Sequence, residues 1–151
     1  MGNSLVKIDI HLIFHIKTTG VKIRECDLND IFAYIGGIIK GVNGIPIEIG
    51  GRTDHIHILA SLPKTMALSE FVRTIKSNSS RWIKDIDVCY KMFEWQEGYG
   101  AFSVSPTLLD KTINYIRTQE EHHKKHMMRD EYKLFLNAYG IKYDERYLID
   151  E

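Results

Sequence analysis

The feature that most restricts the fold is a run of alternating apolar residues near the N-terminus. Every second residue from 6 to 16 is apolar, and the residues between them include Lys7, Asp9, His11 and His15. Successive side chains of a β-strand point to opposite faces of a sheet, so this period predicts a strand with one buried face and one polar face. Such a strand needs pairing partners and a layer that covers its apolar side.

Helical and strand periods alternate along the rest of the chain. Apolar residues at helical spacing predict helices at about 28–40, at 69–84 and from 106 onward, with one more short helix at 130–139. Period-two patterns predict strands at 45–49, 54–62 and 101–104, and the residues at 50–53 predict a turn that joins the first two as a hairpin. Asp27 is placed to cap the first helix, and Ser105-Pro106 is placed to start the third.

The order of these elements is strand, helix, strand, strand, helix, strand, helix. This order predicts an α+β fold, namely a ferredoxin-like split βαβ sandwich with a four-stranded antiparallel sheet, helices on one face, and a C-terminal helix that bears Tyr115. We expect the exposed face of that sheet to carry a row of histidines, which are His11, His15, His55 and His57.

Length and composition restrict the class of protein. The 151 residues predict a single domain, with a core at about 5–126 and a C-terminal helix and tail at 127–151. The 20 basic and 20 acidic residues give a formal net charge of zero, so any nucleic-acid surface must be local. Cys26 and Cys89 stand apart and are expected to be reduced. The sequence shows neither a membrane-spanning stretch nor a signal-peptide pattern, so we expect a cytoplasmic protein.

Two short motifs carry groups suited to phosphate chemistry. His55 and His57 flank Ile56 on a predicted strand, so both imidazoles share one face and can bind one divalent metal ion. Tyr115 and Gln119 share one face of a predicted helix and can supply a nucleophile and a third ligand. Such a site can cut a DNA strand and hold its end covalently. Each motif alone also has a simpler interpretation, as hydrogen-bonded or solvent-facing histidines and as a packed tyrosine.

A basic helix face and two aromatic residues are candidates for DNA contact. Arg73, Lys76 and Lys84 can contact phosphates, although they can equally form a solvated face. Trp95 and Tyr99 can stack on unpaired bases, although Trp95 can instead be buried. A further group of histidines either adds metal ligands or forms a solvated helix end, and its members are His122, His123 and His126.

Four motifs together resemble those of a known family. They are Asp54-His55-Ile56-His57, Lys76-Ser77-Asn78-Ser79-Ser80, Trp95-Gln96-x-Gly98-Tyr99 and Tyr115-Ile116-x-x-Gln119-x-x-His122-His123. From about Ile10 to His123, the sequence resembles the single-tyrosine HUH transposases of bacterial insertion sequences, which are TnpA-type enzymes.

The resemblance implies a fold, a reaction and partners. It implies a ferredoxin-like core, a homodimer, a Mg²⁺ or Mn²⁺ ion, and the cleavage and rejoining of single-stranded DNA at hairpin-marked element ends. By motif matching, His55 and His57 are the metal pair, Gln119 is a further ligand, and Tyr115 forms a 5′-phosphotyrosine. In such a dimer, the Tyr115 helix can reach the other subunit and lie away from its own histidines.

Three other functions stay open on the sequence. A domesticated relative would nick repeated palindromes without moving an element of its own. A non-catalytic protein would bind DNA hairpins and would need none of the four matched positions. A metal hydrolase would release its product to water and would not require Tyr115.

Overall fold

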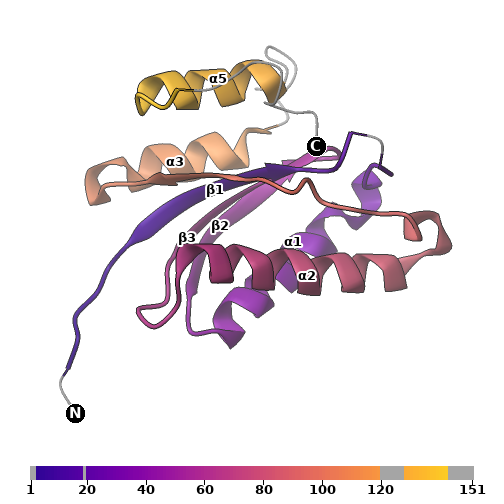
Figure 1. Cartoon of the computed structure of the whole chain (residues 1–151), viewed down its shortest axis with the longest axis horizontal. Coiled ribbons are helices and arrows are strands. Elements are labelled where there is room, and N and C mark those ends of the chain that lie inside the picture. Colours follow the sequence, from indigo (N-terminus) through magenta and orange to yellow (C-terminus); the bar gives the residue numbers. More distant parts are fainter. Residues whose placement is uncertain (1–2, 19, 120–127, 143–151) are drawn as a thin grey trace.

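The computed structural model describes residues 3–18, 20–119 and 128–142, and these contain one four-stranded antiparallel sheet (Figure 1). The strands lie in the order β2-β3-β1-β4 and are β1 (Asp9–His15), β2 (Ile45–Arg52), β3 (His55–Ser61) and β4 (Gly100–Ser103). The α-helices are α1 (Leu28–Gly41), α2 (Leu68–Ile86), α3 (Leu109–Arg117) and α5 (Met128–Ala138). Short 3-10 helices occupy Glu25–Asp27, Val88–Tyr90 and Pro106–Leu108. This topology confirms the predicted ferredoxin-like α+β fold.

The main core lies between the sheet and the helix pair α1 and α2, which are below the sheet in Figure 1. The apolar side chains that alternate along β1 and β3 point into this core, and they are Ile10, Leu12, Phe14, Ile56, Ile58 and Ala60. They meet fully buried residues of the two helices, such as Ile35 and Phe71. The period-two pattern in the sequence therefore predicted the buried face of both strands. Among the helices of the described residues, none is long and apolar enough to cross a membrane.

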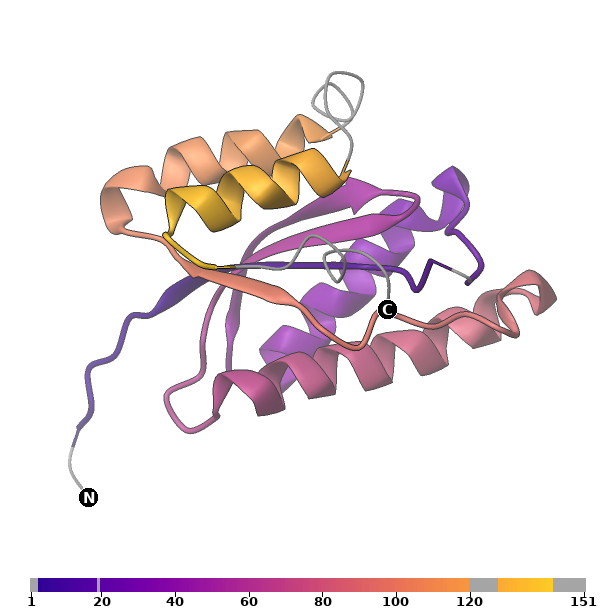
Figure 2. The same cartoon turned by 45° about the horizontal axis from the view of Figure 1, so that its top comes forward.

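The opposite face of the sheet is covered by α3 and α5, which lie above it in Figures 1 and 2. The expectation that helices cover only one face and leave the histidines exposed is therefore not met. His11, His15, His55 and His57 are each at most 3% exposed. The apolar stripe of α3 docks on a small second core, whose members are Ile47, Leu59, Val104, Leu109, Ile113 and Ile116. These partners come from separate elements, so the polar row of β1 gave no sign of them.

Two local expectations are corrected by the structure. The first is the hairpin, because β2 continues to Arg52 and the turn lies at residues 53–54. The second is Asp27, whose side chain makes no capping hydrogen bond to α1. Its carboxylate instead accepts hydrogen bonds from the Tyr90 hydroxyl and from Nε of Arg24, and these partners hold the pKa of Asp27 below its ordinary value. Asp27 thus joins the start of α1 to the segment after α2.

Gly50 allows α3 to approach the sheet closely. It lies opposite His57 in the pairing of β2 with β3. A Cβ atom at this position would lie 2.8 Å from both Cγ2 and the carbonyl oxygen of Ile116. Because a backbone carbonyl cannot move aside as a flexible side chain does, any larger residue would displace α3. Glycine here therefore sets how close α3 lies to the histidine face.

We predict that Gly50→Ala destabilises the fold by about 1–3 kcal/mol, the usual range for overpacking a filled interior. The free energy of unfolding from urea titration followed by circular dichroism measures this change. Gly37→Ala is the matched control, because nothing lies within 4 Å of a Cβ at that exposed position of α1. Gly37→Ala should be neutral or stabilise by up to about 1 kcal/mol, since alanine favours helix. Equal stabilities of the two variants would show that α3 tolerates displacement.

Candidate functional site

Pairing of β1 with β3 gathers four buried histidines beneath α3. In the antiparallel register, His15 lies opposite His55, and Ile13 lies opposite His57. The ring of His57 is central, with its centroid 5.1 Å from that of His55 and 5.1 Å from that of His11. The shared face of His55 and His57 is the one that strand alternation predicted.

Both ring nitrogens of His55 have polar neighbours. Nδ1 lies 2.8 Å from Oδ1 of Asp54, and Nε2 lies 3.0 Å from Oε1 of Gln119. The Gln119 amide also donates from Nε2 to the carbonyl of Tyr115 at 3.2 Å, which turns Oε1 toward His55. When Nδ1 donates its proton to Asp54, a neutral His55 presents a lone pair on Nε2 to the lone pairs of Gln119. Two acceptors that face each other in this way suit a cation, either a proton or a metal ion.

The geometry of this pair fits a metal ion. Two adjacent ligands of an octahedral Mg²⁺ ion, each about 2.1 Å from the metal, are about 3.0 Å apart. His55 Nε2 and Gln119 Oε1 are separated by 3.0 Å. Two imidazoles and one amide oxygen would form a donor set that binds Mg²⁺ or Mn²⁺ and leaves further positions for phosphate and water. In the described part of the chain, no three His, Cys, Asp or Glu side chains form such a group, because the third donor here is an amide.

His57 contributes the second imidazole and is oriented by His11. Nδ1 of His57 lies 2.9 Å from Nε2 of His11, and the other ring nitrogen of His57 is buried. Desolvation by burial lowers the pKa of His11 to about 4, so the His11 ring is neutral at neutral pH. Sequence reasoning had not assigned roles to His11 or Asp54. The position of Asp54 next to His55 was a usable signal, whereas the His11 contact depends on strand register.

Tyr115 lies beside the metal-site candidates of its own chain. Its ring centroid is 5.6 Å from that of His57 and 6.1 Å from that of His11, and both contacts are edge-to-face. Gln119 follows one helical turn later and approaches His55. The structure therefore brings the four predicted positions together in one chain. The expectation of a Tyr115 helix held away from its own histidines is not met, because α3 packs on its own sheet.

Helix α5 supplies aromatic neighbours to this site that the sequence had not revealed. The Phe135 ring lies 5.5 Å from Tyr115 and 5.0 Å from His11, measured between centroids. Tyr139 packs on Phe102, and its hydroxyl donates to the carbonyl of Ser103 at 2.7 Å. These side chains border an open cavity of about 450 Å³ beside Tyr115. The four-residue spacing of the two aromatics on a predicted helix was the available signal.

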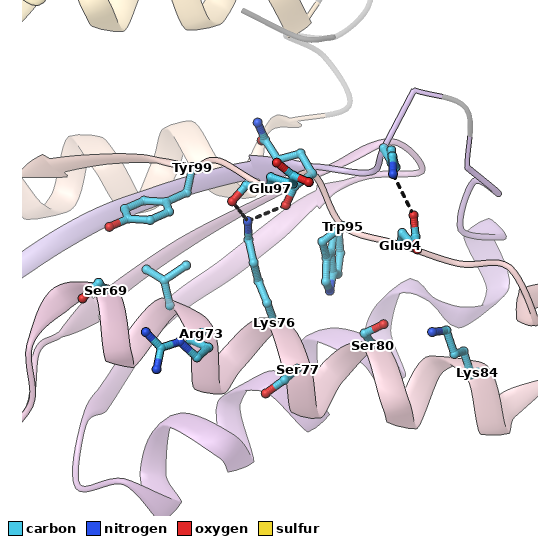
Figure 3. Close-up of a pocket in the computed structure, with 13 residues that line it drawn as sticks. Ser69, Arg73, Lys76, Ser77, Ser80, Lys84, Glu94, Trp95, Glu97 and Tyr99 are labelled. Atoms are coloured by element: carbon cyan, nitrogen blue, oxygen red, sulfur yellow. Dashed lines mark hydrogen bonds and ion pairs between the residues drawn. The ribbon is translucent and has the colours of Figure 1, made fainter. Parts of the chain in front are cut away.

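A separate groove of about 560 Å³ lies between α2 and the segment at 94–99 (Figure 3). Arg73 and Lys84 of α2 line it together with serine hydroxyls, and Tyr99 lines the other side. Helix α2 covers the opposite face of the sheet from α3, so this groove is distinct from the Tyr115 cavity. Cationic groups, hydroxyls and an aromatic ring in one groove suit a phosphate backbone with unpaired bases.

Lys76 points into the wall of this groove and holds it together. Its ammonium donates to the carbonyl of Gln96 at 2.7 Å and to that of Gly98 at 2.6 Å. It also lies 5.1 Å from the ring centroid of Phe14. These contacts, drawn in part in Figure 3, favour a structural role for Lys76 over the predicted phosphate contact. Gln96 in turn exchanges hydrogen bonds with the backbone of His15, so the segment is tied to β1.

Trp95 is a buried residue, as the alternative interpretation of the sequence proposed. Its side chain is 7% exposed, and its indole Nε1 donates to Oγ of Ser79 at 3.0 Å. Phe14 and Phe93 make edge contacts with the ring at centroid distances of 4.8 and 4.9 Å. Of the five predicted DNA-contact residues, Arg73, Lys84 and Tyr99 remain as open groove residues. The group formed by His122, His123 and His126 lies outside the described residues.

The fold and the site together define a class of protein. A ferredoxin-like sheet with a buried histidine pair beneath a tyrosine-bearing helix corresponds to the single-tyrosine transposases that the sequence motifs resemble. The family model described as "Transposase IS200 like" matches residues 4–119, and the chain belongs to this family.

Solved structures share the fold at low sequence identity. A candidate transposase from Deinococcus radiodurans R1 is 18% identical, with a TM-score of 0.61 over 79% of this chain and 96% of that one. A REP-associated tyrosine transposase bound to a REP hairpin is 12% identical, with a TM-score of 0.60 over 82% of this chain and 73% of that one. No curated protein shows a significant match to the sequence.

We predict that Lys76→Met lowers the free energy of unfolding by about 1–3 kcal/mol, because partly buried carbonyls lose a charged donor. Lys84→Met is the matched control, since Lys84 is an exposed lysine of the same helix and the same groove. The control should change stability by less than about 0.5 kcal/mol, as is usual at exposed positions. Chemical denaturation of both variants decides the matter. If Lys76→Met is as stable as the control, the carbonyl contacts do not hold the segment.

Proposed function

We propose that the protein is a transposase that cuts and rejoins single-stranded DNA at hairpin-marked ends through a covalent bond to Tyr115. The observation that supports this most is the Tyr115 ring, which lies 5.6 Å from the ring of His57 and one turn before Gln119. Membership of the IS200-like family supports the transposase reaction. A structural neighbour bound to a REP hairpin supports hairpin DNA as the substrate.

In the proposed reaction, the phenolic oxygen of Tyr115 attacks the phosphorus of a phosphodiester. A bond forms between this oxygen and phosphorus, the bond from phosphorus to the 3′ oxygen breaks, and the leaving 3′ oxygen takes up a proton. The product is a 5′-phosphotyrosine and a free 3′-hydroxyl. A second 3′-hydroxyl then attacks the phosphotyrosine, which restores a phosphodiester and releases Tyr115. The phosphotyrosine retains the phosphodiester link, so no nucleotide triphosphate is consumed.

His55, His57 and Gln119 would hold the divalent ion, either Mg²⁺ or Mn²⁺. When bound, such an ion withdraws charge from a non-bridging phosphate oxygen and so stabilises the crowded transition state. The protein contributes orientation. Asp54 fixes the ring of His55, and the carbonyl of Tyr115 turns the Gln119 amide toward it. Helices α3 and α5 cover the histidines, which excludes water from the reacting phosphate.

The same proposal covers the assembly of the protein. All the assigned groups lie in one chain, so each subunit is complete for cleavage in the cis arrangement. The homodimer that the family resemblance implies would bring two such sites to two DNA ends. Rejoining needs a second 3′-hydroxyl near the phosphotyrosine, and two adjacent sites would supply it.

Radiolabelled single strands from the DNA that flanks the gene provide the test of the covalent reaction. Wild-type protein with Mn²⁺ should form an adduct that survives a denaturing gel. Tyr115→Phe should form none and should still bind the folded hairpin, because only one oxygen is lost. His57→Ala, or EDTA added to wild type, should reduce adduct formation on the order of 10³-fold, since stabilisation by a metal ion is worth several kcal/mol.

Each failure in this experiment points to a different alternative. Cleavage that continues in Tyr115→Phe would identify a metal hydrolase. Hairpin binding without any cleavage by wild type would identify a non-catalytic binding protein. Adduct formation that persists in EDTA would show that the histidines are structural.

We further propose that DNA next to the cleavage site runs through the groove between α2 and residues 94–99. The exposed side chains of Arg73 and Lys84 would contact phosphates, and Tyr99 would stack on an unpaired base. The groove supplies these contacts although the protein has no net charge, because the basic residues are concentrated locally.

Arg73→Ala should weaken binding of single-stranded DNA and lower the slope of log affinity against log salt by about 0.7, the value for one phosphate contact on a single strand. Fluorescence anisotropy with a labelled oligonucleotide at several salt concentrations gives both quantities. Arg81→Ala is the control, because Arg81 is an exposed arginine of the same helix that does not line the groove. If the two variants have the same salt slope, the DNA does not use the groove.

A further inference from the structure

We infer that His11 is a positioning residue that sets the tautomer of His57 and so determines which ring nitrogen of His57 faces the metal site. The inference rests on the proposed function, because it concerns the same site. Nε2 of His11 lies 2.9 Å from Nδ1 of His57, and both residues are at most 2% exposed. No water competes for a hydrogen bond that is buried to this degree, so the bond itself decides where the proton lies.

The two rings allow only two arrangements of protons when both are neutral. In the first, His11 donates from Nε2, so His57 accepts at Nδ1 and carries its own proton on Nε2. In the second, His57 donates from Nδ1, so its Nε2 carries a lone pair. Only the second arrangement lets Nε2 of His57 bind a metal ion, because a metal ligand must be unprotonated. It requires His11 to act as the acceptor, with its own proton on Nδ1.

Each of the three candidate metal donors is oriented by a group from a different part of the fold. Asp54, in the turn before β3, accepts from Nδ1 of His55. The backbone carbonyl of Tyr115, on α3, accepts from the Gln119 amide. His11, on β1, occupies the corresponding place for His57. Partners of this kind raise the basicity of a ligand and fix its ring, and their loss typically weakens metal affinity 10–100-fold.

The packing around His11 holds its ring in place. The edge of the ring meets Phe135 at a centroid distance of 5.0 Å, and the Tyr115 ring lies 6.1 Å away. His11 is also paired with Phe102 of β4 and Leu59 of β3 across the sheet. A side chain fixed on all these sides cannot turn away from His57, so it keeps the hydrogen bond in the metal-free protein.

The first measurement is the tautomer of His57 in metal-free wild-type protein, from long-range ¹H–¹⁵N NMR spectra of the imidazole rings. The expected result is a proton on Nδ1 of His57 and none on Nε2. A His57 ring protonated on Nε2 overturns the inference. This readout needs no metal ion, no DNA and no variant, so it stands even when a substitution prevents folding.

The second measurement compares variants by their Mn²⁺ affinity and their His57 tautomer. His11→Leu removes the acceptor and should weaken Mn²⁺ binding 10–100-fold while moving the His57 proton toward Nε2. His11→Gln places an amide oxygen where Nε2 stood and should keep the wild-type tautomer and affinity. Ile13→Val changes packing directly opposite His57 without removing the hydrogen bond, and it should also behave as wild type.

The outcomes separate this inference from the proposed function. Unchanged affinity and tautomer in folded His11→Leu would overturn the positioning role alone. An equal loss in His11→Gln and His11→Leu would also overturn it, since general packing would then be responsible. Wild-type protein that binds no Mn²⁺ would remove the metal from the proposed function, while the tautomer measurement would still decide the role of His11.

Discussion

The antiparallel pairing of β1 with β3 is the constraint on which the rest of the structure depends. Its register sets Ile13 opposite His57 and His15 opposite His55, and the same register turns Leu12 and Ile58 into the main core. A shift of one residue would move every side chain of the strand to the other face. The burial of the apolar set against α1 and α2 therefore fixes the position of the histidines. The same pairing that stabilises the fold also assembles the candidate site.

Burying polar side chains is unfavourable unless each one finds a partner, and the histidine face meets this requirement with groups from several elements. Asp54, Gln119 and His11 contact the rings of His55 and His57, and Gly50 lets α3 come close enough for Gln119 to reach them. The docking of α3 thus depends on apolar packing at one end and on side-chain amide contacts at the other. Catalytic geometry and helix packing are two results of one close approach.

Sequence periodicity predicted the elements well, because alternation and helical spacing report directly on which face of each element is buried. It placed the strands, both long helices and the shared face of His55 and His57. It could not reveal the His11–His57 contact, which needs the register, or the burial of the histidine face, which needs apolar partners from β2, β3 and the segment after β4. Lys76 was misjudged for a similar reason, since a lysine that binds carbonyls has the same sequence pattern as one that faces solvent.

The carbonyl contacts of Lys76 and the paired hydrogen bonds between Gln96 and His15 join α2, the segment at 94–99 and β1 into one rigid unit. The groove lies on one side of the sheet and Tyr115 on the other, with the short edge strand β4 between them. A polymer that touches both surfaces has to bend around this edge. The thickness of the protein at β4 would then act as a spacer, so that the number of nucleotides between the two contacts is determined by the shape of the protein rather than by base recognition.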